Sequence, residues 1–265
     1  MSAFIDLVAL LDLERTGPDT FIGANPLTGP ERLFGGHVLG QALRAAIHTT
    51  TEDRRPDSLH AYFIRAGRLE EPITYQVTRT RDGRSFSTRQ VTAIQDGKAI
   101  LILATSFHID EPGVDWQQPT PFAAGELDSL PPVQDGHMSW SAFEIRSPGP
   151  RTPDEFPVRH PVWLRTRQPM PDDPIVHLCV LASMSDVAVA PSGRGSYDGP
   201  AFAGASLDHA LWIHRPCRVD EWLRIETTAV SNSASLGLTM GGIHAADGSH
   251  VASLGQGVLI RSINS

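Results

Sequence analysis

Cysteine is scarce in this chain of 265 residues, which contains only Cys179 and Cys217. Two cysteines are too few for a disulfide framework, and their surroundings lack the CxxC or Cys/His spacing of a zinc site. We therefore expect a protein of a reducing compartment, the cytoplasm, with no metal ion and no other cofactor. The C-terminal Ser-Ile-Asn-Ser also differs from the Ser-Lys-Leu peroxisomal signal.

Positive charge and long apolar runs are lacking as well. The formal net charge is −8 and the pI is about 5.7. This balance opposes the counterion release on which nucleic-acid binding relies, so we expect no nucleic-acid partner. No apolar stretch approaches the roughly 20 residues that span a bilayer, so we expect no membrane insertion. The start, MSAFIDLVALLDLERTG, has acidic residues and no basic region, which predicts an amphipathic helix instead of a signal peptide.

What the chain does have is the composition of a folded protein, with 40% apolar and 20% charged residues. Its length suffices for two domains of about 100–150 residues. Residues 34–50, FGGHVLGQALRAAIHTT, place Val38, Ala42 and Ala45 on one helical stripe with further apolar residues beside it. So broad an apolar surface predicts a helix that is enclosed by other structure.

The segment that follows, residues 58–109, is rich in β-branched and aromatic residues. Its runs are broken at Asp82-Gly83 and Asp96-Gly97, and Asp-Gly pairs are strong signals for hairpin turns. The pattern predicts about four antiparallel strands after the helix. A helix of this kind followed by such strands is typical of a curled sheet wrapped around a helix.

The same order of segments then occurs a second time. After a proline-rich stretch, another apolar helix is predicted by DPIVHLCVLASMSDVAVAP. Two later segments, SLDHALWIHRP and ADGSHVASLGQGVLI, then correspond to SLHAYFIRAG and QDGKAILILATSFHI of the first half. We therefore predict an α+β protein with two central helices, each wrapped by a curled antiparallel sheet. The expected division is an N-terminal unit in residues 1–112, a connection in residues 113–170 and a C-terminal unit in residues 171–265.

Four separated motifs carry a resemblance to a known family. The segments FGGHVLGQALRAA, SLHAYFIRAG, RDGRSFSTRQVTAIQDGK with ATSF, and GASLDHALWIHRP resemble the acyl-CoA thioesterase II family. The resemblance implies a tandem (double) hotdog fold and an acyl-CoA substrate. It also implies hydrolysis of medium- to long-chain fatty acyl-CoA to free fatty acid and CoA. Because hotdog sheets commonly pair edge to edge, we expect a homodimer or a homotetramer.

In this family an acid, a hydroxyl and a carboxamide bind the nucleophilic water. The resemblance assigns these roles to Asp186, Ser206 and Gln256, all in the C-terminal half. The matching motifs in the N-terminal half supply the residues that we assign to substrate binding: Gly35, Gly36, His37, Ser58 and His60.

The residues also agree with the chemistry, because a thioester carbonyl is electrophilic and needs an oriented water more than a strong nucleophile. An Asp that accepts a proton gives general-base catalysis, worth about 10²–10⁴-fold. The first helix, residues 34–50, contains no Asp or Glu. Thr105 lies nine residues after Asp96, and Gln256 lies nine residues after Asp247, so the N-terminal half has Thr105 in place of Gln256. Only Ser58, which we match to Ser206, preserves a site residue in that half. We infer one active site per chain. Asp208 and His209 are adjacent in a predicted strand and therefore face opposite sides of the sheet, so we expect structural roles for both.

Three departures from the family pattern keep other functions open. His37 stands where the family has Gln, Asp57 where it has His, and Gly257 where it has Glu. They motivate the alternative of a non-catalytic double hotdog that binds acyl-CoA or lipid. A second alternative is a hotdog enoyl-CoA hydratase, because Asp208 and His214 are similar to the Asp/His pair of those enzymes, although their spacing differs.

Overall fold

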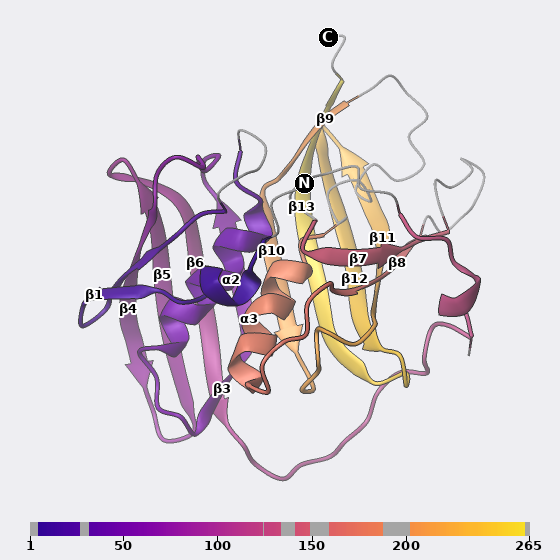
Figure 1. Cartoon of the computed structure of the whole chain (residues 1–265), viewed down its shortest axis with the longest axis horizontal. Helices are drawn as coiled ribbons and strands as arrows, with labels where there is room; N and C mark the ends of the chain where they lie inside the picture. The colour runs from indigo at the N-terminus through magenta and orange to yellow at the C-terminus, as the bar shows by residue number, and fades with distance from the viewer. Residues whose placement is uncertain are drawn as a thin grey trace.

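The computed structural model describes residues 5–26, 32–123, 125–133, 141–148, 159–187 and 202–262. The described strands form one continuous sheet of 13 strands, and its two long helices lie side by side in front of that sheet (Figure 1). The predicted fold class, two central helices wrapped by curled antiparallel sheets, is confirmed. No helix among the described residues is long and apolar enough to cross a membrane.

The N-terminal half contains one central helix and six strands. Its elements are α1 (Leu7–Leu10), β1 (Glu14–Gly17), β2 (Thr20–Gly23), α2 (Gly35–Ile47), β3 (Arg54–Phe63), β4 (Ile73–Asp82), β5 (Phe86–Gln95) and β6 (Lys98–Ile109).

The C-terminal part repeats the plan around a second helix. Its elements are η1 (Leu127–Ser129), β7 (Phe143–Arg146), β8 (Arg159–Thr166), α3 (Pro174–Met184), β9 (Phe202–Ser206), β10 (Asp208–Ile213), β11 (Leu223–Ser233), β12 (Leu236–Ala245) and β13 (His250–Ser262). Strands β7 and β8 fall inside the stretch expected as a connection, and they pair beyond β11 at the edge of the sheet.

The two halves meet where β3 pairs with β10. The strands run antiparallel, with Ala61 opposite His209, and they join the order β1-β2-β4-β5-β6-β3 to the order β10-β13-β12-β11-β8-β7. Short β9 lies outside this path and pairs with β13, with Ser206 opposite Val258. This pairing brings the end of β9 next to Gln256.

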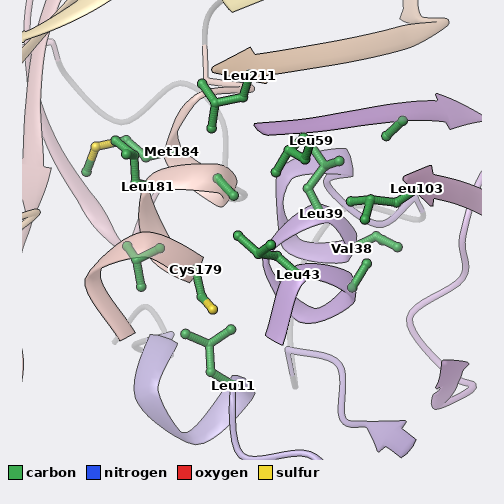
Figure 2. Packing of buried hydrophobic residues seen from close by; sticks show 14 of the residues in the cluster. Leu11, Val38, Leu39, Leu43, Leu59, Leu103, Cys179, Leu181, Met184 and Leu211 are labelled. Atoms are coloured by element: carbon green, nitrogen blue, oxygen red, sulfur yellow. The ribbon is translucent and has the colours of Figure 1, made fainter. Parts of the chain in front are cut away.

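The core lies between the helices and the concave face of the sheet (Figure 2). Leu43 of α2 and Cys179 of α3 are both fully buried there. The helices approach closely at Gly36, where a Cβ atom would overlap the carbonyl of Ser183 on α3. Burial also raises the pKa of the Cys179 thiol to about 12, so this cysteine is a packing residue.

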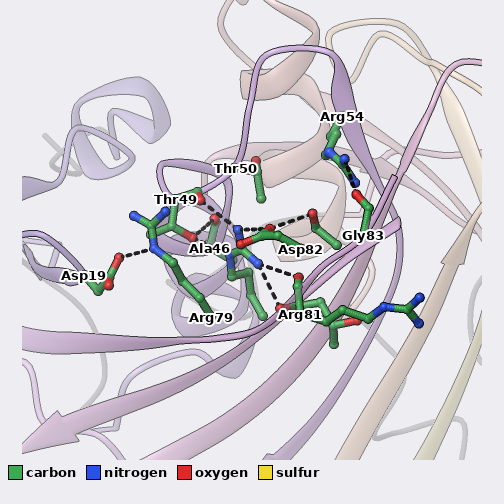
Figure 3. Close-up of polar contacts among 12 residues, drawn as sticks. Asp19, Ala46, Thr49, Thr50, Arg54, Arg79, Arg81, Asp82 and Gly83 are labelled. Carbon is green, nitrogen blue, oxygen red and sulfur yellow. Dashed lines mark hydrogen bonds and ion pairs between the residues drawn. The ribbon is translucent and has the colours of Figure 1, made fainter. Parts of the chain in front are cut away.

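Arg89 of β5 ties the end of α2 to the β4–β5 hairpin through Thr49 and Asp82. Figure 3 labels these two partners. The guanidinium of Arg89 donates to the hydroxyl and the carbonyl of Thr49 at 2.9 Å each, and to Asp82 at 2.6 Å. The side chain is only 1% exposed. The guanidinium therefore loses its hydrogen bonds to water on folding, and these bonds to protein atoms replace them.

The predicted turn at Asp96-Gly97 is confirmed, because both residues have positive φ, 48° and 67°, as a two-residue hairpin turn requires. A second turn has no such sequence signal. Ala234 and Ser235 connect β11 and β12 with φ values of 50° and 65°, although neither residue type favours this conformation.

Candidate active site

Three residues that the sequence predicts as catalytic come together between the two halves. Asp186 follows α3, Ser206 ends β9 and Gln256 lies in β13. The hydroxyl of Ser206 donates to Oδ1 of Asp186 at 3.3 Å, and Nε2 of Gln256 donates to Oγ of Ser206 at 2.7 Å. A carboxylate, a hydroxyl and a carboxamide are therefore in direct contact.

Asp186 is 7% exposed. Burial raises its pKa from 3.8 to about 7, against the opposing effect of hydrogen bonds from Gln256, Ser206 and the backbone of Gly36. Desolvation disfavours the charged carboxylate, which is why the pKa rises. A carboxyl group with a pKa near 7 can both accept and return a proton at neutral pH.

The N-terminal half contributes the start of α2 to this site. Phe34 at the N-cap makes no side-chain capping bond, so the first backbone N–H groups of α2 depend on partners from elsewhere. The N–H of Gly36 bonds to Asp186, and the positive end of the helix dipole favours the carboxylate. Asp186 thus caps a helix of the other half.

A pocket of about 370 Å³ opens beside Asp186 and Ser206. Apolar side chains and two arginines contribute to its wall, among them Val38, Phe63, Leu101, Arg32 and Arg65. Asp186 is its single acidic lining residue among those described, so the wall combines apolar surface with a surplus of positive charge.

His209 and Ser185 also contact the site, although the sequence predicted a structural role for His209 and gave no signal for Ser185. Nδ1 of His209 lies 2.5 Å from Oε1 of Gln256, and Nε2 lies 2.8 Å from Oγ of Ser185. The expected opposite orientation of Asp208 holds, because its carboxylate accepts from the N–H of Gly257 at 2.9 Å. The alternation of side chains along β10 could have indicated that His209 faces inward, because it lies two residues before the buried Leu211.

The five residues that we assigned to substrate binding are not all at the pocket. Gly35 lines it and Gly36 contacts Asp186. His37 is buried and bonds to the carbonyl of Ala24.

The other two lie away from the pocket. The hydroxyl of Ser58 donates to Asp57 at 2.8 Å. His60 is exposed and its ring packs edge-on to Trp212 at 5.2 Å. The structure therefore does not bring His37, Ser58 or His60 together with the three catalytic candidates.

Gly257, which follows Gln256 in β13, and His214 contact residues other than the three catalytic candidates. A Cβ atom on Gly257 would lie 2.7 Å from the carboxylate of Asp208, so the carboxylate that the family has at position 257 would meet Asp208 here. His214 contacts Ser253 at 2.9 Å. Asp208 and His214 therefore have different partners and do not form the Asp/His pair of a hydratase.

Equivalent backbone bonds relate the two halves. Ile64 and Arg65 donate to the carbonyl of Ile100, as His214 and Arg215 donate to that of Val251. Arg65 thus corresponds to Arg215, an offset of 150 residues (215 − 65).

With this offset, the residue of the N-terminal half that corresponds to Ser206 is Pro56 (206 − 150). The predicted match of Ser58 to Ser206 is therefore wrong. The backbone bonds align the two halves with an offset that is two residues larger than the offset of the sequence motifs. A second cavity of about 220 Å³, lined by Pro56, Pro174 and Arg215 among others, occupies the equivalent position. It lacks the hydroxyl of Ser206.

Within the described ranges, no group of three or more His, Cys, Asp and Glu side chains could hold a metal ion. The polar groups around Asp186 are a hydroxyl, a carboxamide and backbone N–H groups. Groups of this kind can form hydrogen bonds to a water or to a carbonyl oxygen.

Solved structures share the whole architecture. A conserved protein of unknown function from Alicyclobacillus acidocaldarius, described as having a hot dog fold, superimposes with a TM-score of 0.79 over 97% of this chain and 98% of its own, at 17% identity. The acyl-CoA thioesterase II TesB2 from Mycobacterium marinum superimposes with a TM-score of 0.85 at 35% identity, covering 97% of this chain and 98% of its own. The fold and the site therefore define a double hotdog thioesterase, a thioester hydrolase.

Family models identify the chain more closely. Residues 25–108 match the acyl-CoA thioesterase N-terminal domain, and residues 109–260 match the acyl-CoA thioesterase C-terminal domain. Human acyl-coenzyme A thioesterase 8 is 32% identical over 96% of this chain and 88% of its own length. The chain belongs to the acyl-CoA thioesterase II family, and these homologues support hydrolysis of acyl-CoA thioesters.

Proposed function

We propose that this enzyme hydrolyses medium- to long-chain fatty acyl-CoA to free fatty acid and CoA by direct attack of a water. The observation that carries the proposal is the contact of Asp186, Ser206 and Gln256 beside a pocket with apolar walls. No covalent acyl-enzyme is needed, because a water held by these three groups can attack the electrophilic thioester directly while Asp186 accepts its proton.

In the proposed reaction the water bonds to Asp186, Ser206 and Gln256, and its oxygen attacks the thioester carbonyl carbon. Asp186 takes the proton of that water, which requires the ionised carboxylate. The positive end of the α2 dipole stabilises the negative charge that develops on the carbonyl oxygen. When the C–S bond breaks, the thiolate of CoA leaves and takes the proton from Asp186, which regenerates the base.

The wall of the pocket agrees with both parts of an acyl-CoA. Val38, Phe63 and Leu101 present apolar surface for an acyl chain. Arg32 and Arg65 line the same pocket, and guanidinium groups are well suited to phosphate groups such as those of CoA. We propose that these arginines hold the CoA part and that the apolar residues hold the acyl part.

The test is release of free thiol from a panel of acyl-CoA substrates, from acetyl-CoA to stearoyl-CoA, with no metal or nucleotide added. Wild-type enzyme should release CoA, and we expect the highest kcat/KM on the longer chains. Asp186→Asn should lower kcat by about 10²–10⁴-fold, the usual contribution of a general base, while acyl-CoA still binds.

Asp57→Asn is the matched control, because Asp57 lines the equivalent cavity of the other half. It should leave kcat close to that of the wild type. Equal activity of Asp186→Asn and wild type would refute the assigned base. Tight binding without any CoA release would instead favour the non-catalytic alternative, and hydration of a trans-2-enoyl-CoA with its thioester intact would favour the hydratase.

The cytoplasmic location and the assembly into a homodimer or homotetramer stay predictions. The molar mass of the native particle, measured by light scattering against 28.8 kDa for one chain, tests the assembly.

A further inference from the structure

A continuous row of five polar side chains crosses the site from one buried end to the other. It runs from Ser185 to His209, Gln256, Ser206 and finally Asp186. The successive distances are 2.8, 2.5, 2.7 and 3.3 Å. Ser185 and Gln256 are fully buried and His209 is 1% exposed, so in this row each group depends on its neighbours for hydrogen bonds.

The chemistry of the groups fixes the direction of these bonds. Oε1 of Gln256 is a carbonyl oxygen and can only accept, so Nδ1 of His209 must carry a proton and donate to it. Burial lowers the pKa of His209 to about 4, so its ring is neutral at pH 7 and holds one proton. Nε2 is then an acceptor.

Ser185 supplies the proton that Nε2 needs. Its hydroxyl donates to the carbonyl of Ala182 at 2.8 Å and lies 2.8 Å from Nε2 of His209, so with the His209 proton on Nδ1 the two acceptors share the hydroxyl proton in a three-centre hydrogen bond. With this arrangement every donor in the row points toward Asp186. The row therefore ends on the carboxylate.

We propose that His209 is a positioning residue of the thioesterase reaction, which holds the Gln256 carboxamide with its NH₂ group toward Ser206. This inference rests on the proposed function of the site. The two ends of a carboxamide are nearly equal in size, so only a neighbour with a fixed donor can select one orientation. His209 is the hydrogen-bond partner of the carboxamide oxygen.

The orientation matters for the hydroxyl of Ser206. When the Gln256 NH₂ group donates to Oγ of Ser206, the hydroxyl proton remains available for Asp186 or for the attacking water. In the reversed carboxamide the carbonyl oxygen would compete for that proton. Asp186 would then lose a hydrogen bond, and the water would lose a defined partner.

The first experiment measures kcat and KM for His209→Leu and His209→Asn. We expect His209→Leu to lower kcat by about 10–100-fold, as a loss of precise positioning does, while KM changes by less than about twofold. His209→Asn should recover part of kcat, because the Asn Nδ2 stands near the place of Nδ1 and can donate to Gln256. Thermal melting curves verify that both variants are folded.

A double-mutant cycle separates positioning from a general structural role. Because His209 acts through Gln256, His209→Leu should change kcat by less than about twofold in a Gln256→Ala background. An equal drop in both backgrounds would overturn the proposal, and so would a wild-type kcat for His209→Leu.

An activity-independent measurement keeps the two proposals apart. In ¹⁵N-histidine-labelled wild-type protein, the ring nitrogens of His209 should report a neutral imidazole with its proton on Nδ1 at pH 7. A proton on Nε2 would contradict the inferred direction of the row even if the enzyme is fully active. If wild type releases no CoA, the proposed function fails, while the ring measurement still decides the orientation.

Discussion

Gly35 packs directly against Asp186, and a Cβ atom on Gly35 would lie 2.8 Å from Oδ2 of that carboxylate. Gly35 begins α2 in the N-terminal half, whereas Asp186 follows α3 in the C-terminal half. The two halves are therefore both parts of one site: one supplies the acid and the other supplies the space and the helix start that hold it.

This contact predicts that Gly35→Ala impairs catalysis. The added methyl would also lie 2.7 Å from the ring of Phe63, so it must displace the carboxylate or the ring. A misplacement of this kind costs about 10²-fold in kcat. Gly113→Ala is the control, because a Cβ atom there meets no atom within 4 Å. Similar kinetics for the two variants would contradict the packing argument.

The pH dependence of the reaction should follow the ionisation of Asp186. Its pKa is raised to about 7 by burial, and only the ionised form accepts a proton from water. We expect kcat/KM to rise with pH, to pass its half-maximum near pH 7 and to level off above it. A profile that is flat between about pH 5 and 9 would show that Asp186 is not the base.

The same burial predicts that Asp186→Asn stabilises the fold. The folded-state pKa of about 7 exceeds 3.8, so the wild-type carboxyl contributes stability that is fully present below about pH 4 and lost as the pH rises to about 7. An Asn does not titrate. The gain in free energy of unfolding should therefore grow to at most about 4 kcal/mol by pH 7.

Denaturant titrations of Asp186→Asn and wild type at several pH values measure this gain. A difference that does not change between about pH 4 and 7 would mean that the carboxyl has no raised pKa in the folded protein. Together with the loss of activity, a stabilised variant would show that the site carries a buried charge at the expense of stability.

Local sequence patterns were enough to predict the two helices and the hairpin at Asp96-Gly97, and the resemblance to the thioesterase family implied the contact of three distant side chains. Each of these features depends on local pattern or on the resemblance. The role of His209 was not predicted, because alternation along a strand separates it from Asp208 but does not say which buried group it meets. That depends on the register of β10 against β13, which places Ala210 opposite Gly255.

The match of Ser58 to Ser206 failed for a related reason. Similar letters around each serine suggested equivalence, whereas the backbone bonds to Ile100 and Val251 relate Ser206 to Pro56. The equivalent backbone bonds of the two halves fix which residues correspond, and similar letters around two serines do not contain that information.

Arg89 predicts a large loss of stability when it is removed. Arg89→Met leaves the buried carbonyl of Thr49 and the part-buried carbonyl of Arg81 without their donor, so we expect the free energy of unfolding to fall by about 2–4 kcal/mol. Arg79→Met is the control, because Arg79 pairs with Asp19 at 2.9 Å while 43% exposed. Its loss should cost less than about 1 kcal/mol. Chemical denaturation compares the two, and equal losses would contradict the importance of burial.

The turn at Ala234 and Ser235 predicts a stabilising substitution. Ser235 has a φ of 65°, a conformation that costs a residue with a Cβ atom roughly 1 kcal/mol more than glycine. Ser235→Gly removes this cost, although the greater freedom of glycine in the unfolded chain offsets part of the gain. We expect a net increase of about 0.5 kcal/mol, or 1–2 °C in Tm. Ser233→Gly, two residues earlier on β11 where φ is not positive, should lower Tm instead. A decrease of Tm in both variants would mean that the strain at Ser235 is smaller than the entropy that glycine adds to the unfolded state.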